Sequence, residues 1–166
     1  MGARKAPTQS GPPHHEQFLW AIRGVQSHFD MIHAAWAHRF GVTTPQLLLI
    51  FALRDFDHHG KGLPVKEVAK LLGVDPTFAT TQSKLLETKG FVSRKTSDED
   101  ARVVRLSLTD KSVKQLDHLS TRQKKIHDYI FSEFTDQGLH ALVAKVLAVK
   151  NKMERASAVA SIDFDD

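Results

Sequence analysis

The 166-residue chain contains no cysteine. This absence excludes a disulfide framework, zinc or iron–sulfur sites built on thiolates, and any cysteine nucleophile or thiol redox switch. Long apolar runs are missing too. The longest, 47–53, has seven residues, well short of the roughly 18 that a membrane-spanning helix needs. The start MGARKAPTQSGPP has no apolar core typical of a signal peptide. We therefore expect a cytoplasmic protein with no membrane partner.

Motifs of the familiar enzyme classes are also missing. His15 and Glu16 begin like the zinc-protease motif HExxH, but Leu19 stands where that motif needs its second histidine. Gly60-Lys61-Gly62 lacks the rest of a phosphate-binding loop, and no Gly-x-Ser-x-Gly elbow occurs. The sequence predicts neither an enzyme nor a cofactor.

The formal net charge is +4, which favours a polyanionic partner. The excess of cations is spread along the chain, so only their arrangement in space can identify that partner.

The N-terminal part divides into a tail and a long helix. Residues 1–13 contain three prolines and two glycines and are predicted to be a flexible tail. From His14 to Phe40, large apolar residues recur at intervals of three and four, which predicts one helix that ends at Gly41.

Two further amphipathic helices are predicted at the C-terminal end. One begins after the cap Thr109 and extends to Phe134, and the other follows Gly138 and extends to Met153. The last residues, 155–166, are expected to fray. The stripes of these helices and of the N-terminal helix offer more apolar surface than a small domain can cover, so we predict dimerisation helices at 14–42 and 109–154.

The segment 43–108 is predicted to hold three short helices followed by a β-hairpin. Each helix has end signals, either a capping Thr or Asp with proline at its start or a glycine at its end. The predicted helices cover 44–54, 65–72 and 76–89, and the predicted strands cover 91–95 and 103–108.

The second and third short helices are separated by a tight turn, which is typical of a helix-turn-helix unit. The third helix is predicted to bury Phe78, Leu85 and Leu86. Its opposite side carries short polar side chains and a lysine, which can bond base edges and phosphates. The candidate DNA contacts are Thr77, Thr80, Thr81 and Lys84, and Thr88 lies on the same side of the helix. A merely solvated helix face is the alternative interpretation.

The hairpin favours the DNA-binding interpretation. Arg94 and Lys95 end its first strand, and Asp100 and Arg102 lie around its charged tip. Such a loop can lay an arginine along the minor groove while a carboxylate holds the guanidinium in position. Helix-turn-helix plus hairpin makes a winged helix, and we predict that these four residues also take part in DNA binding.

The run LLETKGFVSRKTSDEDARVVRLSLTDKS resembles the MarR family of bacterial transcriptional regulators. That family has a Leu-Glu-x-Lys-Gly-Leu/Val-Val stretch, an arginine, a wing with Asp-x-Arg, and a strand ending in Leu-Thr. The pattern falls here on Leu86, Glu87, Lys89, Gly90, Phe91, Val92, Arg94, Asp100, Arg102, Leu108 and Thr109. Gln82 and Ser83 depart from it, because the family usually has apolar residues at both positions. Ser112 departs as well, at a position where members often carry glycine.

The resemblance implies a mainly α-helical fold with a small β-hairpin and an obligate homodimer built from the N-terminal and last two helices. Two reading helices about one DNA turn apart, roughly 34–36 Å, would bind an inverted repeat in double-stranded DNA. The resemblance also implies a repressor that a small aromatic effector, a phenol or aromatic carboxylate, releases from its operator.

Aromatic rings beside ionisable groups are candidates for the effector site. Stacking area next to a charged clamp suits an aromatic carboxylate. The candidate residues are Trp20, Arg23, His33, Trp36, Phe51 and Arg54. The alternative is that the tryptophans and the histidine only pack, and that Arg54 forms an ion pair with Asp30 or Asp55.

Ten histidines leave a metal-responsive regulator as another alternative. Seven of them occur as adjacent pairs or at intervals of five, so these sets do not form the i, i+4 pair of helical zinc sites, and we assign no metal ligand. The seven are His14, His15, His28, His33, His38, His58 and His59. A winged helix that binds protein in place of DNA is a further alternative.

Overall fold

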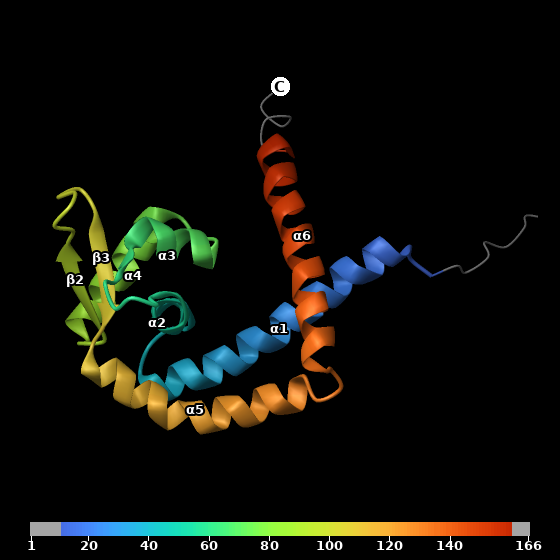
Figure 1. Cartoon of the computed structure of the whole chain (residues 1–166), viewed down its shortest axis with the longest axis horizontal. Helices are drawn as coiled ribbons and strands as arrows, with labels where there is room; N and C mark the ends of the chain where they lie inside the picture. Colours follow the sequence, from blue (N-terminus) through green and yellow to red (C-terminus); the bar gives the residue numbers. More distant parts are fainter. Residues whose placement is uncertain (1–10, 161–166) are drawn as a thin grey trace, which may run out of the picture. The chain divides into compact units, whose positions relative to one another are not determined.

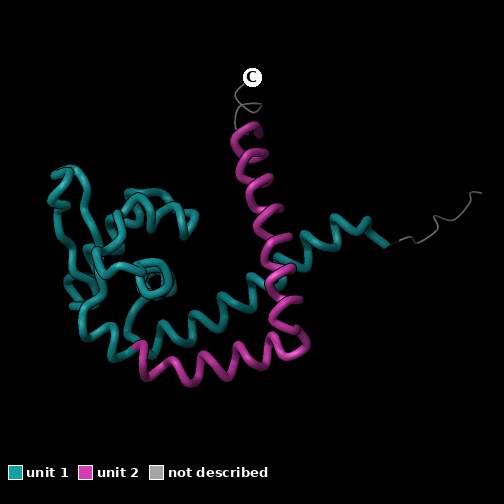
Figure 2. The backbone as a smooth tube through the Cα atoms, in the orientation of Figure 1, with its two compact units in different colours: residues 1–115 teal, residues 116–166 magenta. Residues whose placement is uncertain are grey.

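A computed structural model describes residues 11–160. The chain divides after Gln115 into two compact units, which are described separately below (Figure 2). The predicted flexible tail, 1–13, falls mostly on residues 1–10, which lie outside the described residues. None of the helices that the structure describes combines the length and apolar character needed to cross a bilayer.

The predicted fold, mainly α-helical with a small β-hairpin, is confirmed (Figure 1). In chain order the elements are α1 (His14–Phe40), α2 (Thr44–Phe56), β1 (Leu63–Pro64), α3 (Val65–Leu72), α4 (Pro76–Thr88), β2 (Val92–Thr96), β3 (Val104–Leu108), α5 (Asp110–Ile130) and α6 (Asp136–Ala160).

The first unit is built around a winged helix. Helices α2, α3 and α4 pack on one another and on the β2–β3 hairpin, and α1 packs on α2. The fully buried apolar side chains come from all of these winged-helix elements, and α1 adds Trp36, Ala37 and Phe40 near its C-terminus. The centre of the core consists of Leu47, Leu49, Ile50, Leu53, Val68, Leu86, Val92 and Leu106.

End signals in the sequence set the helix boundaries. Gly41 and Gly73 adopt left-handed φ values of 68° and 65° and close α1 and α3, as a C-terminal glycine does. At the start of α4, the Asp75 carboxylate accepts a hydrogen bond from the Thr77 amide at 2.7 Å, and Pro76 occupies the first turn. These signals place α3 and α4 close together in the chain, with only a short turn between them.

The sheet has a third strand that the sequence did not predict. Two-residue β1 pairs with β3, and the antiparallel order is β1–β3–β2. A strand of two residues cannot show an alternation of apolar and polar side chains. Its strand conformation therefore depends on pairing with β3. The residue before β1 must be glycine, because Gly62 has φ +75°. A Cβ added at this position would lie 2.6 Å from the Ser107 Oγ and 2.8 Å from the Leu106 carbonyl oxygen.

The junction between α5 and α6 differs from the prediction. Helix α5 ends at Ile130, four residues before the predicted Phe134, and α6 begins at Asp136. Gly138 therefore lies inside α6, and its amide donates to the Thr135 Oγ1 at 3.1 Å. The threonine is a capping residue at the start of α6, so treating this glycine as a helix stop was wrong.

Helix α6 also extends past the predicted end of regular structure. Residues 155–160 are helical, so the prediction that fraying begins at 155 is wrong for them. Alanine, the strongest helix former, occupies three of these six positions. The rest of the predicted frayed segment, 161–166, lies outside the described residues.

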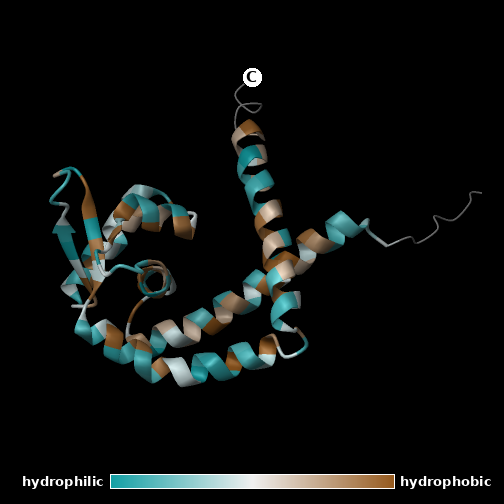
Figure 3. Ribbon diagram, viewed as in Figure 1, coloured by the Kyte–Doolittle hydropathy of each residue, from teal (hydrophilic) through white to brown (hydrophobic). Residues whose placement is uncertain are grey.

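Large apolar side chains are exposed on helices of both units. Figure 3 shows hydrophobic residues, in brown, recurring along α1 and α6. Those on α1 are Phe18, Leu19, Trp20, Ile22, Val25 and Met31. Helix α6 has no buried residue, and its exposed apolar side chains are Leu142, Val143, Val146, Leu147, Val149, Met153 and Val159.

Candidate nucleic-acid interface

The predicted polar face of α4 is exposed in the structure. Thr77, Thr81, Lys84 and Thr88 are exposed and Thr80 is half-buried. The Thr81 Oγ1 donates to the Thr77 carbonyl oxygen at 3.0 Å, and the Thr88 Oγ1 donates to the Lys84 carbonyl oxygen at 3.1 Å. Because each hydroxyl proton is used within the helix, these oxygens present acceptors outward, which suits the amino groups of adenine and cytosine.

The inner face of α4 was predicted wrongly. Leu86 is fully buried, but Phe78 and Leu85 are 41% and 47% exposed. The buried side chains are instead Ala79, Ser83 and Leu86, spaced by four and three residues. Two small residues on this face leave room for neighbouring elements, and Ser83 forms hydrogen bonds there that an apolar side chain cannot form.

A buried amide joins α4 to α2. The Gln46 side chain is only 3% exposed, and its Nε2 donates to the Gln82 Oε1 at 3.1 Å. The Gln46 Oε1 accepts from the Thr43 amide at 3.2 Å and from the Lys89 Nζ at 3.3 Å. Lys89 also donates to the Gly41 carbonyl oxygen at 3.0 Å. This cluster, the Gln46 junction, connects the end of α1, the start of α2 and both the middle and the end of α4.

Sequence reasoning missed the role of Gln46, although a signal was present. Gln46 directly precedes the apolar run 47–53, and Gln82 stands at a position where an apolar residue was expected. Two polar residues on faces that should be buried are best satisfied by bonding each other.

Arg94 is held by two side chains of α4. Its Nη1 donates to the Ser83 Oγ, and its Nε lies 3.6 Å from the Glu87 Oε2. The Arg94 side chain is only 11% exposed. The Ser83 Oγ donates onward to the Thr80 carbonyl oxygen at 2.9 Å. Arg94 therefore ties β2 to α4, and only part of its guanidinium is available to a ligand.

The wing presents Arg102 to solvent in a fixed orientation. Its Nε and Nη2 donate to the two Asp100 carboxylate oxygens at 3.1 and 3.2 Å, and its backbone amide donates to the Asp100 Oδ1 at 2.9 Å. These hydrogen bonds lower the pKa of Asp100, with the side chain of Arg102 as the main cause. The Arg102 side chain is nevertheless 91% exposed. The predicted pairing of these two residues is present, and Lys95 on β2 is exposed as well.

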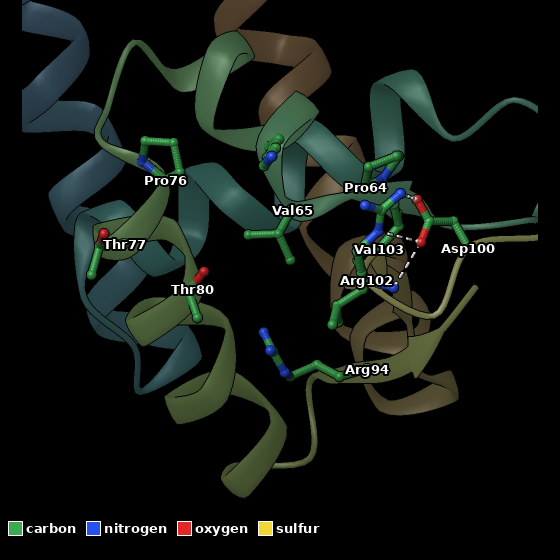
Figure 4. Close-up of a pocket in the computed structure, with 11 residues that line it drawn as sticks. Pro64, Val65, Pro76, Thr77, Thr80, Arg94, Asp100, Arg102 and Val103 are labelled. Carbon is green, nitrogen blue, oxygen red and sulfur yellow. Dashed lines mark hydrogen bonds and ion pairs between the residues drawn. The ribbon is translucent and has the colours of Figure 1, made fainter.

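A pocket of about 720 Å³ lies among the starts of α3 and α4, strand β2 and the wing (Figure 4). It brings together five of the eight predicted DNA-binding residues, whereas Thr81, Lys84 and Lys95 lie outside its lining. Cationic side chains outnumber the single carboxylate in it. The lining residues with polar side chains are Lys66, Thr77, Thr80, Arg94, Asp100 and Arg102.

Four of the six predicted effector residues form one cluster. The His33 ring lies 5.7 Å from the Trp36 ring and 5.9 Å from the Phe51 ring, centroid to centroid. The Arg54 Cζ lies 4.5 Å from the Phe51 centroid. Trp36 and Phe51 are almost fully buried, so packing accounts for much of their contact area. Arg54 also pairs with Asp55, with a distance of 2.6 Å from Nε to Oδ1.

The other two predicted effector residues lie elsewhere on α1. Trp20 and Arg23 precede His33 by 13 and ten residues, which places them roughly 15–20 Å away along the helix axis. Both are exposed, Trp20 at 70%. Their role stays a prediction.

No group of three or more His, Asp or Glu side chains within residues 11–160 is arranged to hold a metal ion.

The winged helix matches a known family. A family model described as the MarR family matches residues 43–104. This segment belongs to the MarR family. A curated relative, the HTH-type transcriptional repressor MdtR of Bacillus subtilis (strain 168), is 32% identical over 97 residues, which is 58% of this chain and 60% of MdtR. The match thus spans less than two thirds of that relative. The uncharacterized HTH-type transcriptional regulator YdgJ of the same organism is 20% identical over 86% of this chain and 82% of its own.

Solved MarR structures share the fold of most of the chain. A MarR/EmrR family transcriptional regulator from Acinetobacter sp. ADP1 aligns with a TM-score of 0.70 and 17% identity, covering 87% of this chain and 99% of that one. The S. aureus MepR–DNA complex aligns with a TM-score of 0.66 and 16% identity, covering 81% and 97%. At these identities the likeness concerns the fold alone.

The Gln46 junction generates a stability prediction. Gln46→Leu removes the acceptor for the Thr43 amide and the Lys89 Nζ and leaves the Gln82 Oε1 without its donor. Because buried polar groups lose their partners, we expect the free energy of unfolding to fall by about 1–3 kcal/mol in urea denaturation. The control is Gln26→Leu, which removes an exposed amide bonded to Asp30 and should change stability by less than about 0.5 kcal/mol. Equal stabilities of the two variants would contradict the role of the junction.

Proposed function

We propose that the protein is a homodimeric DNA-binding transcriptional regulator, a repressor that reads an inverted repeat in double-stranded DNA. The observation that carries this proposal is the placement of an exposed threonine face and a carboxylate-held, exposed arginine on one compact unit. The repressor MdtR and the MepR–DNA complex, both similar to this chain, support it. The role places the protein in the cytoplasm, with the DNA that it regulates.

Different side chains are assigned to different parts of the DNA according to their chemistry. The threonines of α4 read base edges in the major groove, where donor and acceptor patterns distinguish all four base pairs. Arg102, held by Asp100, lies along the minor groove, where the negative potential is strongest. Lys84 and Lys95 contact phosphates, which fix the register of the complex but carry little sequence information.

A second copy of the chain would cover the exposed apolar helix faces. On α6, Leu142, Val146, Val149 and Met153 are spaced by four, three and four residues, so they form one stripe along the helix. Such a stripe favours burial against another helix. A two-fold axis makes the partner surface identical and places two reading helices for the two halves of an inverted repeat.

The regulating ligand is proposed to be a small aromatic molecule, a phenol or an aromatic carboxylate. The cluster of Trp36, Phe51, His33 and Arg54 supplies ring faces next to two groups that can bond a carboxylate. Trp20 and Arg23 form a separate ring-and-cation pair on α1. The two sets are therefore tested independently.

The DNA contacts predict two different phenotypes. Arg102→Ala should weaken binding to selected and scrambled duplexes alike and reduce the slope of log K against log salt by about one, because a sequence-independent charge contact is lost. Thr80→Val and Thr81→Val should change the preference between duplexes that differ at single base pairs, by about 1–3 kcal/mol for a contacted pair. Fluorescence anisotropy at several salt concentrations measures both effects, on a duplex selected from a random library.

The same titration tests the alternatives. Equal effects of all three substitutions on random DNA would contradict the assigned roles. A wild-type protein that binds selected and scrambled duplex equally at physiological salt would instead favour a winged helix that binds protein.

The α6 stripe predicts the oligomeric state. Sedimentation equilibrium of the full chain should give twice the mass of one chain, and Val146→Asp should raise the dimer dissociation constant by at least tenfold, because an unpaired carboxylate would be buried. Ala144→Asp is the matched control, since it adds the same charge about 160° around the helix from position 146, counting 100° per residue, and should leave the mass unchanged. A monomeric wild-type protein would overturn the dimer.

Effector release is tested with 4-hydroxybenzoate as the probe. We expect it to lower DNA affinity at least tenfold, which requires about 1.4 kcal/mol of preference for the DNA-free state. Cyclohexanecarboxylate, a non-aromatic control of similar charge, should have a weaker effect. Arg54→Met should abolish the response if the cluster is the site, whereas Arg23→Met should abolish it if the separate pair is. A response that survives both substitutions would remove both assignments.

A further inference from the structure

Arg94 is nearly buried, and its hydrogen bonds run in one direction. An arginine can only donate, so the Arg94 Nη1 donates to the Ser83 Oγ, and the Ser83 hydroxyl in turn donates a hydrogen bond to the Thr80 carbonyl oxygen. The Ser83 side chain is fully buried. The family pattern normally places an apolar residue at position 83. An apolar side chain has no lone pair and could not accept the hydrogen bond from Arg94.

The remaining contacts define the orientation of the guanidinium. Its Nε lies beside the Glu87 carboxylate, which is 47% exposed. The Nη2 has no hydrogen-bond partner among the described residues, and the guanidinium points from β2 toward Thr80 at the edge of the pocket (Figure 4). Two of the three nitrogens are therefore held, and one remains for a ligand.

Building on the proposed DNA-binding function, we propose that Ser83 is a positioning residue that turns one edge of the Arg94 guanidinium toward a DNA backbone phosphate. The anionic ligand follows from the pocket, because Arg102 and Lys66 line it together with Arg94 against one carboxylate, Asp100, which already binds Arg102. A guanidinium held in place loses less rotational freedom when it binds than one that swings on a long side chain. Ser83 thus strengthens a contact that it does not make itself.

Ser112 provides a matched control for Ser83. It is also a fully buried serine in the same compact unit, and its Oγ also donates to a backbone carbonyl oxygen, that of Phe91. Within residues 11–160, no hydrogen bond joins it to Arg94. Removing either hydroxyl should cost similar stability, so only a positioning role separates the two variants.

The experiment is a double-mutant cycle on the full chain. Ser83→Ala should weaken binding to the selected duplex about three- to tenfold, the range for one intramolecular hydrogen bond, and should have no effect in an Arg94→Ala background. Ser112→Ala should leave DNA affinity unchanged at a similar stability in urea. An equal loss with and without Arg94, or an equal loss for both serine variants, would overturn the proposal.

A second measurement needs no DNA and separates this proposal from the proposed function. In ¹H–¹⁵N spectra of the free protein, the Arg94 side-chain N–H signal should exchange slowly with water in the wild type and in Ser112→Ala, and quickly in Ser83→Ala. Unchanged exchange in Ser83→Ala would overturn the positioning role even if DNA binding is confirmed. Faster exchange without any sequence-specific DNA binding would instead overturn the proposed function and the phosphate, while leaving the serine–arginine contact in place.

Discussion

The orientation of α4 depends on hydrogen bonds formed in a nearly dry environment. An amide such as that of Gln46, 3% exposed, destabilises the fold unless it is bonded. Its partners are the N-cap residue of its own helix, Thr43, and two residues from the middle and the end of α4, Gln82 and Lys89. Apolar contacts tolerate sliding, but hydrogen bonds have narrow ranges of distance and angle, so they define the rotation of a helix more closely. The outer face of α4 can therefore carry short threonines, because its orientation is determined from the inside. Ser83 and Arg94 add a second such constraint from the side of the wing.

Several cationic side chains near α4 form hydrogen bonds within the fold. The net charge therefore overestimates the number of cations that are free to bind DNA. The Lys89 Nζ bonds the Gly41 carbonyl oxygen and Gln46. The Lys111 Nζ donates to the Lys89 carbonyl oxygen at 2.7 Å and lies 4.2 Å from the Phe91 ring centroid. Lys89 and Lys111 therefore fasten helix ends, and their bonded ammonium groups are poor partners for phosphate. Arg94 is also partly used in this way, since two of its three guanidinium nitrogens contact α4. A residue's charge alone therefore overstates its availability to DNA, and exposure and prior partners decide which cations can bind.

Local signals predicted most of the fold, and tertiary partners determined the remainder. Caps and glycines gave the boundaries of α3 and α4 within a residue or two, because they act within one turn. Strand β1 depends on pairing with β3 about 40 residues later, so its two residues carry no signal of their own. Phe78 and Leu85 were predicted inward from their hydrophobicity alone, but small Ala79 and polar Ser83 take that face. The wing pair Asp100 and Arg102 was predictable because it is local, whereas the contact between Ser83 and Arg94 needed the fold.

The arrangement of α1 offers a short route between the candidate effector cluster and α4. Trp36 belongs to that cluster, and Phe40, one turn further, stacks on Phe91 with ring centroids 6.3 Å apart. The helix then ends at Gly41, whose carbonyl oxygen accepts from Lys89 at the end of α4. A ligand can shift an equilibrium only as far as its affinities for the two states differ, so it must favour one placement of α1 over another. Both α1 and α4 contribute to the Gln46 junction. A shift of the end of α1 would therefore change the geometry of that junction. Coupling of a ligand at the cluster to α4 then requires no long chain of intermediates, only the few hydrogen bonds that already orient this helix.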